Sequence, residues 1–305
     1  MNTNELELLK MIADIDGTPA GAFNIRANGA LSSRNVTENI NIREKADGNG
    51  IEIIIKPGTK GEKVHIPVII SESGLSEMVY NDFIIGEGAE VDIVAGCGIH
   101  NCGGEESRHD GIHTFFVGKN AKVTYTEKHY GSGDGNGERN MNPATVINIA
   151  EGGYMEMETT QIEGIDSTKR VTTARLDKDA TLIIREKLMT HGKQRAETDF
   201  TVDLDGENSS ANVISRSVAK DNSYQLFLSR INGNNICTGH TECDAIIMDE
   251  AKVSAIPEIT ANHIDASLIH EAAIGKIAGE QLTKLMTLGL TEQEAEEQIV
   301  NGFLK

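Results

Sequence analysis

Cysteine and histidine side chains give this sequence its clearest potential for metal chemistry. Residues 235–259, NICTGHTECDAIIMDEAKVSAIPEI, contain Cys237 and Cys243 with His240 between them. Thiolates and imidazoles are the ligands that zinc and iron favour. Residues six apart on a strand point to the same face but lie about 20 Å apart. Without a turn between them, we therefore expect two separate sites, or one site and one core thiol.

A second cluster of candidate ligands lies in residues 95–113, AGCGIHNCGGEESRHDGIH. Its potential ligands are Cys97, His100, Cys102, His109, Asp110 and His113. The Cys-x4-Cys spacing is not that of a zinc finger, because no second pair follows at the standard distance. We interpret the stretch as a candidate metal site in one glycine-rich loop, with hydrogen-bonded loop histidines as the alternative.

A third candidate is the adjacent pair His270 and Glu271, placed at the expected passage from a strand into a helix. No His-Glu-x-x-His spacing follows, which excludes a zincin. The sequence also has no P-loop, no Gly-x-Gly-x-x-Gly after a strand and no Gly-x-Ser-x-Gly elbow. It therefore shows no means of hydrolysing ATP, transferring hydride or forming an acyl-enzyme.

A repeated pattern predicts the elements that position these residues. A polar turn and a small residue are followed by apolar residues two and four positions later, at Ala89, Ala121, Gly153, Ala180 and Ala251. The first four are 32, 32 and 27 residues apart. Alternation after each turn indicates short strands with one buried face, and recurrence near 30 residues is typical of a solenoid. The pattern predicts a mainly β fold, a β-helix, with an immunoglobulin-like sandwich as the structural competitor.

Both ends of the chain have helical patterns. Residues 3–13 place Leu6, Leu9 and Ile12 on one face of a short helix. After about residue 276, two helices are expected, the first ending at Gly289 and the second opening with a Thr291–Glu294 capping box. Their apolar stripe would comprise Leu282, Leu285, Met286, Ala295, Ile299 and Phe303. This stripe is expected either to pack on the chain's own sheet or to bind a partner.

The charge balance restricts the classes of partner. Lys and Arg total 28 against 47 Asp and Glu, a net charge of −19, which disfavours nucleic acid and anionic membranes as partners. No apolar run is long enough to cross a bilayer, and the N-terminus lacks the features of a signal peptide. Four cysteines are too few for a disulfide framework in a chain of this length. We therefore expect a cytoplasmic protein with free thiols or metal-bound cysteines.

The C-terminal third resembles the SufB/SufD family, scaffold subunits of the SUF machinery for iron–sulfur cluster assembly. The resemblance rests on CDAIIMDEAKVSAIPEI, HEAAIGKI and EQLTKLMTLGLTEQEAEEQIVNGF, in that order over residues 243–303. It extends weakly to about residue 25. It implies a right-handed parallel β-helix core over residues 25–270, a helical segment over residues 1–24 and a C-terminal helical region over residues 271–305. The chain looks like the short, minimal form of these proteins and carries Ile269 where bacterial SufB has a second acid.

The resemblance also implies a site and partners. Cys243 matches the assembly cysteine near the subunit interface, and His270 with Glu271 matches the other interface ligands of a transient cluster, expected to be of the 4Fe–4S type. Cys97, His100, Cys102, His109, His113 and Cys237 remain weaker metal candidates. A SufC-type ABC ATPase would dock on Leu282, Leu285, Met286, Ile299 and Phe303. The implied assembly is a homodimer through the C-terminal part of the β-helix that passes clusters to apo acceptor proteins and has no catalytic activity of its own.

Two other functions remain open at this point. One is a metal-dependent enzyme on a β-helix, such as a polysaccharide lyase, which the absence of Trp and the small number of aromatic residues disfavour. The other is a purely structural partner of an ABC ATPase, in which the cysteines belong to the core. Uptake of iron by the protein would separate the scaffold from the structural partner.

Overall fold

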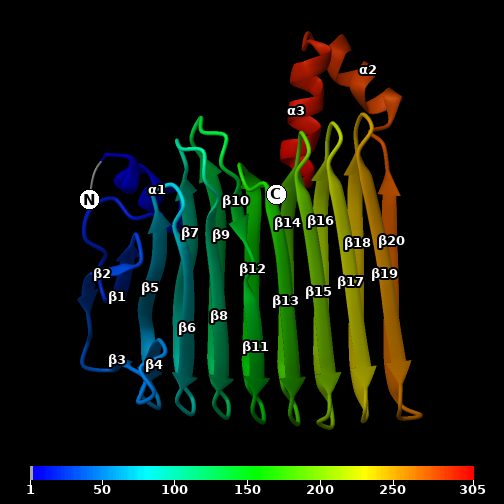
Figure 1. Ribbon diagram of the computed structural model, residues 1–305. Helices are drawn as coiled ribbons and strands as arrows, with labels where there is room; N and C mark the ends of the chain where they lie inside the picture. Colours follow the sequence, from blue (N-terminus) through cyan, green and yellow to red (C-terminus); the bar gives the residue numbers. More distant parts are fainter. Residues whose placement is uncertain (1–2) are drawn as a thin grey trace.

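The computed structural model describes residues 3–305, in which the strands coil into a β-solenoid with two facing ten-stranded sheets (Figure 1). Successive coils stack by parallel pairing, for example between β7 and β9. The mainly β fold and the solenoid are confirmed. A sandwich of hairpin-connected strands is excluded for the coils, because their neighbouring strands run parallel.

The two sheets alternate along the chain. In spatial order, the first sheet comprises β2 (Ala30–Asn35), β1 (Ala22–Ala27), β5 (Lys60–Ile70), β7 (Glu90–His100), β9 (Lys122–Ser132), β12 (Tyr154–Glu163), β14 (Thr181–Thr190), β16 (Ser209–Ala219), β18 (Cys237–Ile247) and β20 (Ala266–Gly275). The second comprises β19 (Lys252–Ala261), β17 (Tyr224–Gly233), β15 (Arg195–Leu204), β13 (Ser167–Leu176), β10 (Arg139–Met141), β8 (Ser107–Val117), β6 (Ser76–Ile85), β4 (Ile51–Ile55) and β3 (Ile40–Glu44), with β11 (Ala144–Ile149) pairing with both β8 and β13.

The sequence repeat corresponds to the register of the first sheet. Val91, Val123, Met155 and Leu182 are successive in-register neighbours on β7, β9, β12 and β14. All four are buried in the core between the sheets. The fifth repeat, at Ala251, instead precedes β19 of the second sheet. Each coil contributes a turn followed by an alternating strand to both sheets, so the local pattern does not distinguish the two.

The N-terminal end of the solenoid is closed by antiparallel pairs, β1 with β2 and β3 with β4. The helix α1 (Thr3–Ala13) has the predicted bounds and buries Leu9 and Ile12 as expected, but Leu6 is 50% exposed and Leu8 packs in its place. The helix covers the outer face of β7 at Gly96, where an added Cβ would lie 2.4 Å from the carbonyl oxygen of Ile12. Close packing of α1 therefore depends on a residue without a side chain.

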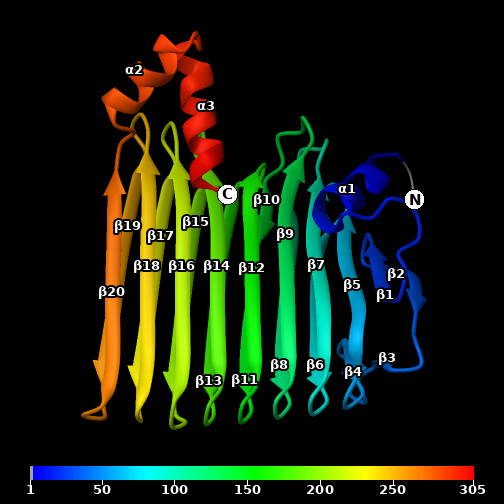
Figure 2. The same ribbon diagram turned by 180° about the vertical axis from the view of Figure 1, so that it is seen from behind.

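The C-terminal segment departs from the expected boundary. His270 and Glu271 lie in the middle of β20, not at its end, and the helical hairpin begins at Gly279. Its helices are α2 (Gly279–Thr287), which lies above the upper ends of β18 and β20, and α3 (Glu292–Phe303), which reaches down to the upper ends of β14 and β16 (Figure 2). The predicted capping box at Thr291 is present, and Gly289 has the left-handed φ of 99° that is favoured after a helix end.

The hairpin is anchored on the solenoid through α3. Val300 and Leu304 pack against Val218 of β16, with Phe303 partly buried beside them. The helix α2 has no buried residue in the described chain, and Met286 is 43% exposed. No helix within residues 3–305 combines the length and apolar character needed to span a membrane.

The last coil leaves one edge of each sheet open. Among the described strands, β20 pairs only with β18 and β19 only with β17. Exposed isoleucines gather on these strands and the turn between them, namely Ile256, Ile259, Ile264, Ile269 and Ile274. We call this the open end of the solenoid. At the N-terminal end the edge strands β2 and β3 also have one partner each, but they pair with it antiparallel and do not continue the parallel stacking of the coils.

Candidate metal centre

Cys243 lies on the inner face of β18, one coil from the open end. It is 1% exposed and belongs to the hydrophobic core between the two sheets. Its in-register neighbours are Ser215 on β16 and Ala272 on β20. Burial, followed by the charges of Glu186 and Asp244, raises the pKa of the Cys243 thiol to about 12. A metal or an electrophile must therefore displace a proton to bind this sulfur at neutral pH.

His270 also lies on the inward-facing side of its strand, on the terminal strand β20. It pairs in register with Thr241, an inward-facing neighbour of Cys243 on β18, so that Cys243 and His270 are diagonal neighbours across these strands. Burial lowers the pKa of the His270 imidazole, and within residues 3–305 its Nδ1 is buried without a hydrogen-bonding partner. The structure thus brings a thiol and a neutral imidazole together on one face of the last coil.

Glu271 points the opposite way, because side chains alternate along a strand. It lies opposite Glu242 on the outer face of the first sheet, and its side chain is 67% exposed. Its Oε2 lies 3.4 Å from Nε2 of His240. Of the three residues that the resemblance groups together, the structure places Cys243 and His270 on one face of the sheet and Glu271 on the other.

Cys237 lies on the same strand and face as Cys243, as the spacing predicts. Both thiols are buried at positions six residues apart on the continuous strand β18, so they belong to separate surroundings. The Cys237 sulfur fills the space left by Gly233, where an added Cβ would lie 3.1 Å from it. Cys237 is therefore packed as a core residue.

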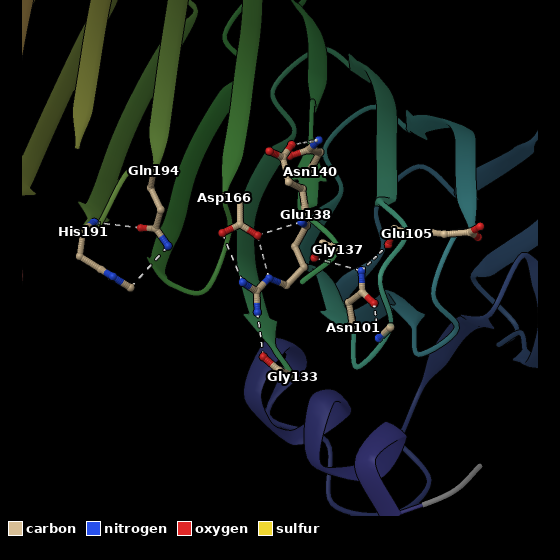
Figure 3. Close-up of polar contacts among 11 residues, drawn as sticks. Asn101, Glu105, Gly133, Gly137, Glu138, Asn140, Asp166, His191 and Gln194 are labelled. Atoms are coloured by element: carbon tan, nitrogen blue, oxygen red, sulfur yellow. Dashed lines mark hydrogen bonds and ion pairs between the residues drawn. The ribbon is translucent and has the colours of Figure 1, made fainter. Parts of the chain in front are cut away.

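The stretch from Cys97 to His113 is not one loop. It spans the end of β7, a turn over residues 101–106, and the start of β8. Asn101, which is fully buried, organises the turn: its Nδ2 donates to the carbonyl oxygens of Glu105 and Gly137 at 2.8 and 3.2 Å (Figure 3). The expectation of a single loop is wrong, because the alternating residues on both sides extend the strands into it.

The potential ligands of this stretch separate into two groups. Cys97, His109 and His113 are buried, whereas Cys102 is exposed, with its Sγ 3.1 Å from Nε2 of His100. Asp110 is held by Arg108 at 2.8 Å. Within the described residues, no three potential ligands of this stretch come close enough to share an ion. The geometry therefore favours two local contacts, His100 with Cys102 and Arg108 with Asp110, over one metal site.

His109 and His113 pack closely around Gly111 inside the solenoid. An added Cβ at Gly111 would lie 3.1 Å from Nε2 of His113 and 3.4 Å from Nε2 of His109. Neither ring nitrogen of His109 has a hydrogen-bonding partner within residues 3–305. Burial lowers the pKa of His109 to about 3 and that of His113 to about 4. Both imidazoles are therefore neutral at physiological pH.

A buried polar row, which the sequence interpretation missed, connects this region with Cys243. Its members are successive in-register neighbours on the inner face of the first sheet: Glu127, Thr159, Glu186, Ser215 and Cys243. Ser215 Oγ donates to Oε2 of Glu186 at 2.8 Å. The sequence does contain a signal for this row. Glu127 and Glu186 are charged residues at positions that the alternation assigns to the core, two places after Tyr125 and Ile184.

Arg170 contacts both carboxylates of this row from the facing sheet. Its Nη1 donates to Oε2 of Glu127 at 2.5 Å, and its Nε lies 3.8 Å from Oε1 of Glu186. Burial opposes ionisation of Glu127, but the Arg170 guanidinium holds its pKa well below the usual range. Burial raises the pKa of Glu186 despite the opposing effect of Arg170. The interior is thus a core of apolar residues with one polar row, in which two carboxylates share a single guanidinium.

A pocket of about 640 Å³ lies among the turns at the upper ends of the strands. Arg139 and Asp166 line it and bind each other through Nε–Oδ2 and Nη2–Oδ1 contacts of 2.9 and 3.2 Å. On its other side, Oε1 of Gln194 accepts from the backbone N–H of His191 at 2.9 Å (Figure 3). None of the four cysteines lines this pocket in the described structure, which separates it from the Cys243 region.

Comparison with known proteins defines the class to which this solenoid belongs. The family model described as "SUF system FeS cluster assembly, SufBD core domain" matches residues 69–303, well over half of the chain. The chain belongs to this SufBD family of iron–sulfur cluster assembly proteins. The match begins within β5, so the capping strands β1 to β4 lie before it.

Relatives in three archaea have similar sequences and are named iron–sulfur cluster assembly SufBD family proteins. The Archaeoglobus fulgidus relative is 35% identical over 263 residues, covering 85% of this chain and 69% of its own length. The Methanocaldococcus jannaschii relative is 31% identical over 256 residues, covering 83% and 80%. A Pyrococcus horikoshii relative is 24% identical over 315 residues, covering 99% and 94%. The similarity thus includes the whole solenoid.

Proposed function

We propose that this protein is a scaffold on which an iron–sulfur cluster is built and from which it passes to apo acceptor proteins. The single observation that carries the site assignment is the shared orientation of Cys243 and His270 toward the inside of the last coil. A thiolate is a strong soft ligand for the nascent cluster, whereas an imidazole binds iron more weakly and leaves the cluster transferable. The cluster is cargo, proposed to be of the 4Fe–4S type.

The proposed assembly is a homodimer through the open end of the solenoid. The edges of β19 and β20 present backbone groups that a second copy can pair with, and exposed isoleucines such as Ile256 and Ile269 surround them. A two-fold contact of this kind would bring the Cys243 and His270 of each copy close to the interface. Glu271, on the outer face of β20, would lie at the margin of the same interface.

The energy for assembly is proposed to come from a SufC-type ABC ATPase, because this chain has no P-loop. The proposed docking surface is the C-terminal hairpin, where Leu282 and Leu285 are partly buried and Met286 is exposed. Ile299 is partly exposed as well, while Phe303 already packs on the solenoid. The free thiols and the acidic surface support a reducing, cytoplasmic location.

Anaerobic reconstitution with ferrous iron and sulfide tests the site. The wild-type protein should develop the broad visible absorption of an iron–sulfur cluster, and electron paramagnetic resonance after reduction should identify the cluster type. Cys243→Ser should abolish the absorption, whereas the matched variant Cys237→Ser, on the same strand and face, should retain it. Equal absorption in the two variants would overturn the assignment of Cys243.

Docking is tested separately with a SufC-type ATPase and the intact protein. Coelution in size-exclusion chromatography should be lost in Met286→Asp, whose side chain is on the exposed side of α2. A control substitution on the far end of the molecule, Leu31→Asp, changes an equally exposed residue of β2 and should leave coelution intact. Coelution that survives Met286→Asp unchanged would exclude this face of α2 as the docking surface.

A further inference from the structure

Three potential metal ligands meet on the outer face of the first sheet, behind Cys243. His240 and Glu242 occupy alternate positions on β18, and Glu271 lies opposite Glu242 on β20. One imidazole nitrogen and one oxygen from each carboxylate all lie within 4.8 Å of one another. This is the only group of three such ligands among the residues that the structure describes.

The hydrogen bond between His240 and Asn212 orients the imidazole. Nδ1 of His240 lies 3.0 Å from Oδ1 of Asn212, the in-register neighbour on β16. An amide oxygen can only accept, so Nδ1 carries the proton of the bond, and Nε2 is the nitrogen at which a metal would bind. That nitrogen lies 3.4 Å from Oε2 of Glu271. Metal-bound histidines typically have a hydrogen-bonded second nitrogen of this kind.

The charge arrangement around the three residues is unbalanced. Elsewhere on this face, carboxylates contact cations on the next strand, as Glu158 does with Lys187 at 2.7 Å. Glu242 and Glu271 instead lie directly opposite each other, and like charges in this position destabilise a sheet. Within residues 3–305, neither carboxylate has a lysine or arginine at salt-bridge distance, and the ion pair of Glu271 is with His240. Burial and then a side-chain hydrogen bond with Asp244 raise the pKa of Glu242, and the charge of Arg216 only partly opposes this. A bound cation would remove the repulsion between the two acids.

We propose that His240, Glu242 and Glu271 form a binding site for one divalent transition-metal ion, ferrous iron in the working protein. One imidazole and two carboxylates with open coordination positions suit Fe²⁺, Mn²⁺ or Zn²⁺, whereas Mg²⁺ and Ca²⁺ prefer oxygen ligands alone. The choice of iron rests on the proposed scaffold function. Because Glu242 adjoins Cys243 in the chain, the ion would be held on the opposite side of β18 from the thiol.

Anaerobic titration of the full-length protein with Co²⁺ tests the site by spectroscopy. Co²⁺ bound by nitrogen and oxygen ligands has weak d–d bands, whereas a thiolate ligand adds an intense charge-transfer band. We expect d–d bands without the charge-transfer band at one equivalent, and their loss when Fe²⁺ competes. His240→Ala and Glu242→Gln should each weaken Co²⁺ binding at least tenfold. Asn212→Ala, which removes the partner of Nδ1, should weaken it by about 10- to 100-fold.

His263→Ala is the matched control, because His263 is a partly exposed histidine beside a carboxylate, 3.9 Å from Asp265. This variant should bind Co²⁺ with wild-type affinity. The proposal is overturned if His240→Ala also binds with wild-type affinity. It is likewise overturned if the first equivalent produces the thiolate charge-transfer band, since the ion would then be bound by a cysteine.

The experiment separates this site from the proposed scaffold function. Cys243→Ser should retain the d–d bands while losing the reconstituted cluster. Loss of both properties in that variant would place the metal at the thiol and overturn the outer site. If wild-type protein binds Co²⁺ as described but never forms a cluster, the outer site stands and the scaffold proposal fails.

Discussion

Glu186 and Cys243 occupy the same buried row and are separated by one strand, on which Ser215 donates a 2.8 Å hydrogen bond to Glu186. Burial and the Glu186 charge raise the pKa of Cys243 to about 12. Alkylation of Cys243 by iodoacetamide should therefore accelerate about tenfold per pH unit between about pH 7 and 10, as the thiolate fraction rises. Mass spectrometry of timed samples would measure it, with exposed Cys102 labelled first.

The variant Glu186→Gln tests the contribution of the Glu186 charge to the raised pKa of Cys243. Removing the carboxylate should lower the pKa of Cys243 and increase its alkylation rate at a fixed pH. Glu158→Gln, a carboxylate on the outer face, should have no such effect. A Cys243 rate that levels off above about pH 9, as expected for an ordinary thiol, would contradict the raised pKa.

Arg170→Met should destabilise the protein strongly. It leaves Glu127 and Glu186 buried with no guanidinium between them, a change that typically costs about 3–5 kcal/mol. Urea denaturation would measure the free energy of unfolding. The double variant Arg170→Met/Glu127→Gln should recover part of the loss, because one buried charge is removed along with its partner. If the double variant loses as much free energy of unfolding as the single variants Arg170→Met and Glu127→Gln lose together, Arg170 and Glu127 are not directly coupled.

The stability of the protein should fall as the pH is lowered from about 6.5 to 3, in part because of His109. Burial and the nearby His129 and His113 lower the pKa of His109 to about 3. The unfolded chain binds this proton near pH 6.5, whereas the folded protein does not until about pH 3, so acid favours unfolding. Over this range the group contributes roughly 5 kcal/mol to the pH dependence, as an upper estimate.

His109→Leu should flatten this part of the stability profile, measured by urea denaturation across the same pH range. At neutral pH it should cost little, since a leucine needs no hydrogen-bonding partner where both ring nitrogens had none. His263→Leu, at a partly exposed position, should leave the slope unchanged. If the slope is the same in His109→Leu, the His109 imidazole of the wild-type protein is protonated in the folded state over the same pH range as in the unfolded state.

Lysine at the open edge should separate the proposed homodimer into monomers. Ile269→Lys places a charge on β20, and Ile256→Lys places one on β19, at positions that are 52% and 53% exposed in the single chain. Charged side chains prevent strand edges from pairing with another copy. Light scattering after size-exclusion chromatography would give the mass. Phe116→Lys, on an exposed position of β8 away from this edge, should remain dimeric.

Thr291→Ala should loosen α3 without unfolding the solenoid. The change removes the hydroxyl that accepts from the backbone N–H of Glu294, and losses of this kind typically cost about 0.5–2 kcal/mol. Hydrogen exchange should accelerate in α3 but not in β16 or β18. Thr287→Ala, at the end of α2, should leave exchange in α3 unchanged.

The sequence was sufficient to predict the solenoid because its coils repeat a local signal. The spacing of 32, 32 and 27 residues between Ala89, Ala121, Gly153 and Ala180 equals the register shift of the strands that follow them. Helix ends were predictable for the same reason, since the Thr291 capping box is a local arrangement. The end of β20 was not, because HEAAIGKI suits a helix in isolation and is held as a strand by pairing with β18.

The candidate site was only partly predictable. Motif resemblance selected Cys243, His270 and Glu271, but the alternation of side chains along β20 separates Glu271 from the other two. His240 was noticed only as a neighbour of Cys237 and Cys243, and Glu242 was not noticed, because their proximity to Glu271 depends on the register between β18 and β20. Arg170 was not noticed either, since its contact with Glu127 joins two sheets across 43 residues of sequence.

The two ends of the solenoid differ, because antiparallel strands end it on the N-terminal side and parallel strands end it on the C-terminal side. Stacked parallel coils could in principle continue into a fibre by adding copies at both ends. Here the antiparallel strands β1 to β4 occupy the first position. When two open ends meet about a two-fold axis, only capped ends face outward, so growth stops at two copies. The N-terminal strands would thus set the size of the assembly, although they take no part in its contact.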